Sequence, residues 1–234
     1  MSPVSTSQSI GSFVVERPSR SKVFERFGLD YCCGGHLSLD EACAKGGVEP
    51  SSVLRALAEF DAASPADEPA PWLQNLAALA DHIEATHHAY LHEELPRMRG
   101  LVEKVAKAHG ETDPRLIRLT QVFERFQGEV ELHLAKEEQI LFPLIRRMVQ
   151  GESAASFHCG SVRGPVSVMR HEHDDHAVNL GLIKELTENF AVPDYACNTY
   201  LAMLAALQEL EQDLHRHIHK ENNILFPGVE ALEG

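Results

Sequence analysis

The strongest constraint on the fold is a motif that the chain contains twice. The stretch HLAKEEQILFP at residues 133–143 returns as HIHKENNILFP at residues 217–227, so that its His, Glu and Pro recur 84 residues apart. Each copy has a further His upstream of it, His88 for the first and His173 for the second, and these two are 85 residues apart. A repeat of this length can hold one helical hairpin. The pattern therefore predicts an all-α fold in which two hairpins form an antiparallel four-helix bundle with a pseudo-twofold axis.

Apolar residues recur at helical spacing through the repeated region. Pro96 is expected to kink or interrupt the first helix, and Pro114 lies in the first turn of the second. The stretch of residues 151–165 is rich in Gly and Ser and is expected to be a loop. The four expected helices run from about 72 to 108, 113 to 150, 166 to 190 and 193 to 230.

A break in composition divides the chain. The stretch DAASPADEPAP carries three prolines and three acidic residues without apolar periodicity, and we interpret it as a linker. Before it, SKVFERFG and EPSSVLRALAEF have helical spacing, and SLDEAC begins with a serine able to cap a helix. The predicted parts are a small helical domain at residues 1–60, a linker at 61–71 and the bundle at 72–234.

Histidines concentrate in the repeated region. Of the 14 in the chain, only His36 precedes position 82. Residues four apart share one face of a helix, so the His and Glu of each repeated motif should point together toward the core. An isolated core histidine is usually a hydrogen-bonded polar residue, but buried carboxylates that meet several imidazoles are best explained by bound cations. The predicted metal ligands are His88, His133, Glu137, His173, His217 and Glu221.

Four imidazoles and two carboxylates suit two metal ions, each bound by two His and both bridged by Glu137 and Glu221. Nitrogen and oxygen donors with vacant positions fit iron better than structural zinc. We expect Glu129 and Asp213, one turn earlier, to support the ligands. The remaining histidines are expected at the surface or around the ligands: His82, His87, His92, His171, His176, His215 and His219.

The residues that follow each ligand pair extend this prediction. Ile140 and Leu141 should continue the buried stripe below Glu137. Glu138 is replaced by Asn222 in the second copy, so we expect the acid next to the bridging position to be dispensable.

A second chemical feature is LDYCCGGHLSLDEAC at residues 29–43. Adjacent cysteines rarely bond to each other, and the two glycines that follow Cys32 and Cys33 allow the backbone to approach a partner or ligand closely. The spacing does not match a zinc site. We therefore expect exposed thiols with a catalytic role, able to exchange electrons, bind NO or accept iron. Cys159 and Cys197 are expected to be ordinary residues.

Composition excludes several classes of function. The net charge of −14 argues against a nucleic-acid-binding surface. No apolar run approaches the about 20 residues that span a bilayer, and the start of the sequence lacks a signal-peptide pattern. The five cysteines have no framework spacing, which fits a reducing compartment. We expect a cytoplasmic protein that binds neither nucleic acid nor membranes.

Taken together, LDYCCGGHLSLDEAC, HLAKEEQILFP, SVMRHEHD and HIHKENNILFP resemble the RIC family of di-iron proteins that repair iron centres, also described as the YtfE, ScdA or NorA type. The resemblance covers about residues 10–230. It implies an ScdA-type N-terminal domain and a hemerythrin-like four-helix bundle. It also implies that the six chosen residues bind iron and that the family's cysteine pair is Cys32 and Cys33. Position 177 is Ala where oxygen-carrying hemerythrins repeat a His, which argues against simple oxygen transport.

The resemblance and the repeat lead to one functional expectation. We expect a non-haem di-iron protein of nitrosative and oxidative stress defence, with two Fe ions joined by an oxo or hydroxo bridge when oxidised. The centre would sequester NO, reduce it to nitrous oxide as an NO reductase, or release iron for damaged iron-sulfur clusters. The alternative is a hemerythrin-like carrier or sensor of O2 or NO without turnover. The expected partners are damaged iron-sulfur proteins and an electron donor, and a homodimer is left open.

Overall fold

The computed structural model describes residues 5–65, 67, 71–156 and 160–233. Over these ranges the regular secondary structure is helical, and one isolated bridge joins Ser9 to Ser38. The prediction of an all-α fold is therefore confirmed. The chain forms two compact units, one of residues 80–214 and one of residues 1–79 with 215–234. None of the described helices combines the length and the hydropathy needed to cross a membrane.

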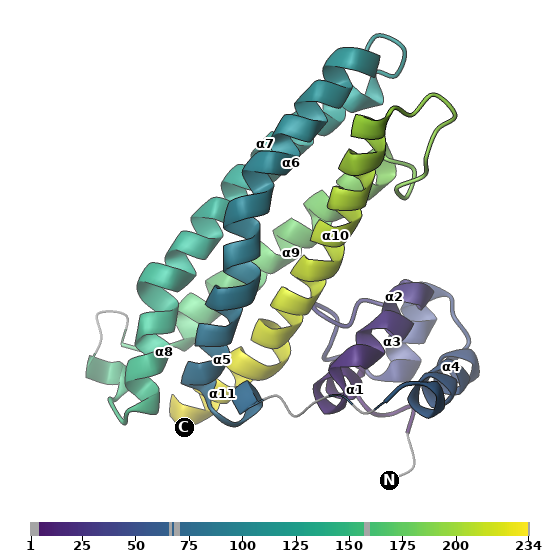
Figure 1. The fold of residues 1–234 in the computed structure, drawn as a ribbon. Coiled ribbons are helices and arrows are strands. Elements are labelled where there is room, and N and C mark those ends of the chain that lie inside the picture. Colours follow the sequence, from purple (N-terminus) through teal and green to yellow (C-terminus); the bar gives the residue numbers. More distant parts are fainter. Residues whose placement is uncertain (1–4, 66, 68–70, 157–159, 234) are drawn as a thin grey trace. The chain divides into compact units, whose positions relative to one another are not determined.

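Long helices build the unit of residues 80–214 (Figure 1). α7 packs along both α6 and α9, and Lys184 on α9 pairs with Glu211 on α10 at 2.8 Å. Successive helices run in opposite directions, as the repeated hairpin predicted (Figure 1). The four helices are α6 (Ala89–His109), α7 (Arg115–Lys136), α9 (Arg163–Leu186) and, as far as residue 214, α10 (Asn198–Lys220).

Apolar side chains at helical spacing fill the interior of this unit. Leu91 on α6, Phe126 on α7 and Leu210 on α10 are completely buried. Burial of one such side chain stabilises the fold by about 1.5–3 kcal/mol. The apolar stripes of the sequence therefore hold the bundle together, and they fix which helix faces point inward.

Within the described part of the chain, three wide π-helical turns interrupt the long helices. In η4 the backbone N–H of Phe142 donates to the carbonyl of Glu137, five residues back, and in η6 the N–H of Phe226 donates to that of Glu221. Such turns occur frequently at functional sites. Each of the three contains one predicted metal ligand, and their bounds are η3 (Glu84–His88), η4 (Glu137–Leu141) and η6 (Glu221–Leu225).

The proline of the repeated ILFP accounts for the width of two of these turns, η4 and η6. Pro143 has no N–H, and in an α-helix its ring would clash with the carbonyl four residues back. Pro143 is the second residue after the π-turn and the second residue of α8 (Phe142–Val149), and Pro227 has the same place in α11 (Phe226–Glu233). We infer that the repeated proline favours the wide turn, which holds Glu137 and Glu221 at its start.

The wide turn also corrects one prediction. Leu141 is buried as expected, but Ile140 is 60% exposed. The expectation assumed an uninterrupted α-helix, in which Ile140 would lie on the same face as Glu137. The π-turn changes the angle between successive residues and rotates Ile140 to the solvent side.

Several helix ends differ from the predicted ones. α6 runs through Pro96 without interruption, since that residue is exposed and water can reach the carbonyl that lacks a donor. α9 ends at Leu186, and the three residues from Glu188 to Phe190 have positive φ angles of 50–59°. α10 then begins at Asn198 instead of Pro193.

The other unit begins with short helices. Their core contains Phe13, Phe24 and Tyr31, all of which are buried. The predicted serine cap is confirmed, because Ser38 and Glu41 exchange hydrogen bonds in a capping box at the start of α3. The helices are α1 (Ile10–Glu16), α2 (Ser21–Phe27), α3 (Leu39–Gly46) and α4 (Pro50–Ala63).

The predicted linker overlaps the end of α4, which reaches Ala63. Residues 66 and 68–70 lie outside the described residues, so the linker at 61–71 stays a prediction.

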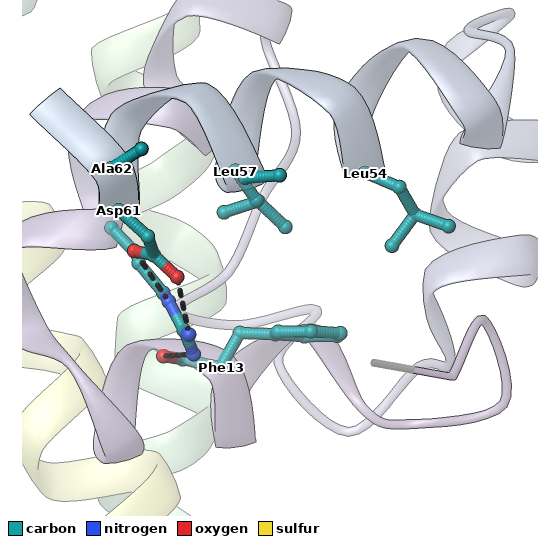
Figure 2. A pocket seen from close by; sticks show the side chains of 7 residues that line it. Phe13, Leu54, Leu57, Asp61 and Ala62 are labelled. Atoms are coloured by element: carbon teal, nitrogen blue, oxygen red, sulfur yellow. Dashed lines mark hydrogen bonds and ion pairs between the residues drawn. The ribbon is translucent and has the colours of Figure 1, made fainter. Parts of the chain in front are cut away.

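A cavity of about 450 Å³ lies between α1 and α4 (Figure 2). Phe13, Leu54 and Leu57 line it with apolar surface. Its two charged side chains pair with each other, because Arg20 Nη2 donates to Asp61 Oδ2 at 2.7 Å. The pair is the charged part of an otherwise apolar lining, and it joins α4 to the 3-10 turn of Pro18–Arg20.

Candidate metal centre

Four of the six predicted ligands gather in the unit of residues 80–214. Glu137 Oε2 lies 3.4 Å from His88 Nε2 and 3.3 Å from His133 Nε2. The Nε2 atoms of His133 and His173 are 3.2 Å apart. This is close to the separation of two nitrogens that bind one ion at about 2.1 Å. All four side chains are at least 98% buried, so this group consists of ligand atoms that face one another inside the bundle.

The other two predicted ligands lie together in the unit of residues 1–79 with 215–234. His217 Nε2 is 2.9 Å from Glu221 Oε1, and both side chains are buried. His217 is on the last turn of α10, and Glu221 opens the π-turn that follows. The i,i+4 geometry that the sequence predicted for this pair is therefore present.

In two of these imidazoles the Nδ1 atom, which faces away from the other ligands, is hydrogen-bonded to a carboxylate. His88 Nδ1 is 3.0 Å from Glu138 Oε1, and His133 Nδ1 is 3.0 Å from Glu172 Oε2. A proton on Nδ1 is then shared with the carboxylate, and the lone pair of Nε2 remains for a metal. The hydrogen bond from His133, assisted by Lys136, lowers the pKa of Glu172 to about 2, so this carboxylate is ionised at neutral pH.

Sequence reasoning missed these two carboxylates. We expected Glu138 to be dispensable because Asn222 replaces it in the second copy, but Glu138 contacts both His88 and His92. Glu172 immediately precedes His173, where the first copy has His87 before His88. These carboxylates stand at positions where the two copies of the repeat differ, because each copy supports its imidazoles with other residue types. A search for matching positions therefore could not find them.

Glu129 and Asp213, which we predicted to support the ligands, form the following hydrogen bonds with residues outside the predicted ligand set. Asp213 Oδ1 is 2.9 Å from Nδ1 of the buried His87, and Glu129 accepts a hydrogen bond from Asn179 at 2.7 Å. His176 and His219 are also buried. His82 and His215 are half-buried, and His92 and His171 are exposed.

We expect Glu172→Gln to weaken metal binding by about 10–100-fold, the usual effect of removing a carboxylate that supports a ligating histidine. The amide keeps an oxygen for His133 Nδ1 but loses the charge that makes the imidazole a stronger donor. Competition with a chelator measures the affinity. Asp175→Asn, on the exposed side of α9, is the matched control. Equal affinities for the two variants would contradict the prediction.

Cys32 and Cys33 lie on a tight loop in the unit of residues 1–79 with 215–234. Their Sγ atoms are 4.0 Å apart, and Cys32 Sγ is 3.1 Å from Asp30 Oδ1. We expected two exposed thiols, but Cys32 is buried and Cys33 is half-buried. The hydrogen bond to Cys33, burial and the nearby carboxylate raise the pKa of Cys32 well above its usual value. Cys32 is therefore a protonated thiol in the absence of a bound cation.

The loop is fixed to the π-turn that carries Glu221. Asn223 Nδ2 donates to the carbonyl of Cys32 at 3.0 Å, and His219 Nδ1 donates to that of Tyr31 at 3.3 Å. Burial lowers the pKa of His219 to about 4, so this imidazole is neutral. The cysteine pair and one predicted ligand therefore share a single local structure.

The sequence analysis expected Cys159 and Cys197 to be ordinary residues. Cys197 is exposed and lies 3.4 Å from His109 Nε2, which lowers the pKa of the thiol to about 7. It has no contact with the predicted ligands among the hydrogen bonds described here. Cys159 lies outside the described residues.

Two family models match the chain. Residues 79–229 match the hemerythrin HHE cation binding domain, and residues 6–61 match ScdA_N, which is described as a domain of unknown function. The first match includes all six predicted ligands, and the second includes the cysteine pair. A cation-binding domain with two buried groups of His and Glu indicates a dinuclear metal site.

Proteins of similar sequence align with nearly the whole chain. The iron-sulfur cluster repair protein YtfE of Musicola paradisiaca is 36% identical over 228 residues, 97% of each chain. The YtfE of Edwardsiella ictaluri is 37% identical over 221 residues, 93% of this chain and 94% of that one. A probable iron-sulfur cluster repair protein of Haemophilus influenzae is 33% identical over 223 residues, 95% of this chain and 96% of that one. The similarity therefore extends across both matched domains.

Proposed function

The chain belongs to the YtfE family of iron-sulfur cluster repair proteins, and from this membership we propose that it repairs damaged iron-sulfur clusters by means of a di-iron centre that binds NO. The observation that carries the proposal is the buried, repeated set of His and Glu side chains in a hemerythrin domain. The two iron ions would be held by His88, His133, Glu137, His173, His217 and Glu221.

The donor set fits iron. Four imidazoles and two carboxylates offer nitrogen and oxygen atoms and no thiolate, whereas structural zinc prefers closed sites that often contain thiolates. With two His for each ion and both Glu as bridges, each ion would have four protein donors and would keep room for a small molecule. The contacts of Glu137 Oε2 with both His88 and His133 support its bridging role.

The protein side chains orient the donors and exclude water. Glu138 and Glu172 hold protons on the Nδ1 atoms of His88 and His133, and this points the Nε2 atoms inward. Two ferrous ions would supply the two electrons that convert two NO and two protons into one nitrous oxide and one water. An external electron donor would then reduce the site again, and iron released from it would pass to damaged iron-sulfur proteins in the cytoplasm.

The test uses the full-length protein loaded with Fe2+ in the absence of oxygen. After addition of NO, gas chromatography measures nitrous oxide and electron paramagnetic resonance detects iron nitrosyls. An apo iron-sulfur protein, added separately, reports iron transfer. We expect a changed iron spectrum together with nitrous oxide or transferred iron. A spectrum unchanged by NO, with no iron reaching the acceptor, would exclude the proposed function.

The second candidate is a carrier or sensor of NO or O2 without turnover. The match to the hemerythrin domain favours it. It predicts a stable, reversible complex with no nitrous oxide and no iron transfer, so the same experiment separates the two functions.

A further inference from the structure

A third group of metal-ligating side chains lies outside the bundle ligands. Asp30, Cys32 and Cys33 each offer an atom within 4.8 Å of the others. We propose that these three residues form a second metal site, which binds one divalent ion through two thiolates and one carboxylate.

The distances suit a single ion. Two thiolates that bind one ion at about 2.3 Å in tetrahedral geometry have sulfurs about 3.8 Å apart, and the Sγ atoms of Cys32 and Cys33 are 4.0 Å apart. Asp30 Oδ1 lies 3.1 Å from Cys32 Sγ and belongs to the same group of potential ligand atoms. A small movement of the three side chains completes three of four tetrahedral positions, and the fourth is open to water or to a partner's ligand.

A disulfide is the less favourable use of this pair. Disulfides usually join Cα atoms that are about 4.4–6.8 Å apart, whereas neighbouring Cα atoms in a chain are about 3.8 Å apart. Without a cation, Cys32 Sγ donates a hydrogen bond to the Asp30 carboxylate at 3.1 Å. A divalent ion that replaces the two thiol protons stabilises both thiolates beside this carboxylate, and its binding releases the protons to solvent.

The site is already organised by backbone hydrogen bonds. The N–H groups of Cys32 and Cys33 donate to Asp30 Oδ1 at 3.0 and 2.9 Å, and that of Gly34 donates to Oδ2 at 3.0 Å. From the other side, Asn223 holds the carbonyl of Cys32. These bonds fix the carboxylate and the cysteine backbone before any metal arrives.

The surroundings also allow exchange of the ion. Asp30 is exposed and Cys33 is half-buried, so an ion can enter from solvent, while Cys32 is buried. Two thiolates with one carboxylate favour a borderline first-row ion such as Fe2+. If the proposed function holds, the ion is Fe2+ in transit, and the site gives the cysteine pair a role in iron delivery.

Co2+ tests the site because it gives a thiolate-to-metal charge-transfer band that imidazole and carboxylate ligands do not give. Reduced, metal-free full-length protein is titrated with Co2+ without oxygen. We expect the band in the wild type and its loss in the Cys32→Ser/Cys33→Ser variant. Cys33→Ser alone keeps one thiolate and should lose about half of the band. Circular dichroism confirms that each variant is folded.

Cys197→Ser is the matched control, and it should keep the full band. Glu137→Leu should also keep it while losing metal from the bundle, which separates this site from the proposed di-iron centre. No band in the wild type, or a band that persists in the double variant, would overturn the proposal. Either result would leave the NO experiment with the iron-loaded bundle unaffected.

Discussion

Glu137→Leu should lose metal from the bundle and with it the reaction with NO. Glu137 is completely buried, and its Oε2 contacts the Nε2 atoms of both His88 and His133. A leucine offers no donor atom to either proposed ion, so metal analysis should find fewer than two ions per chain. Because Glu221 is the equivalent residue of the second copy, Glu221→Leu should have the same effect.

The same variant should separate metal binding from folding. Burial of an ionised carboxylate is costly without a cation, and leucine removes this cost from the metal-free protein while it fills a similar volume. We therefore expect the metal-free variant to unfold at the same urea concentration as the metal-free wild type, or at a higher one. Wild type should gain about 2.7 kcal/mol when free metal is 100 times its Kd, and the variant should not.

Glu131→Leu provides the control, because Glu131 is exposed on α7, the helix that ends where the π-turn of Glu137 begins. It should bind two ions and show the full stabilisation by metal. Two ions per chain in Glu137→Leu would contradict the bridging role.

Gly35→Ala should destabilise the unit that contains the cysteine loop. A Cβ atom at this position would lie 2.2 Å from Asn223 Oδ1 and 2.6 Å from the carbonyl oxygen of Tyr31. The asparagine side chain can move, but only by giving up its hydrogen bond to Cys32, and the Tyr31 carbonyl belongs to the backbone. Forced overpacking of this kind costs about 1–3 kcal/mol.

Two measurements test the prediction for Gly35→Ala. Urea unfolding should give a lower free energy of unfolding, and the half-buried Cys33 should react faster with a thiol reagent once its loop is displaced. Gly100→Ala is the control, because nothing lies within 4 Å of a Cβ at that helical position. It should be neutral or stabilising by about 0.5–1 kcal/mol. Equal stability of the two variants would show that the loop accommodates the methyl group.

Much of the fold was predictable because it depends on periodicity. Apolar spacing and the 84-residue repeat gave four antiparallel helices, and Ser38 with Glu41 gave a helix start that the structure confirms. The periodicity gave no sign of the π-turns, because a pattern of 3.6 residues per turn assumes an uninterrupted α-helix. Ile140 was misplaced for this reason.

The candidate site divides in the same way. The six predicted ligands could be chosen from the sequence, since i,i+4 spacing and a repeat place side chains on one face of each helix. Their supporting carboxylates could not be chosen, because Glu172 reaches His133 from a different helix, 39 positions away. The cysteine loop is a further example, as its partner Asn223 is 191 positions from Cys32.

The sequence by itself therefore determined the helical class, the repeated hairpin, the family and the residue types of a dinuclear site. Only the tertiary structure showed that Cys32 is buried, that Glu138 supports His88 and that the cysteine loop is joined to the π-turn of Glu221. The physical reason is range. Helical spacing acts between residues three or four positions apart, whereas burial and these hydrogen bonds arise between segments that meet only when the chain has folded.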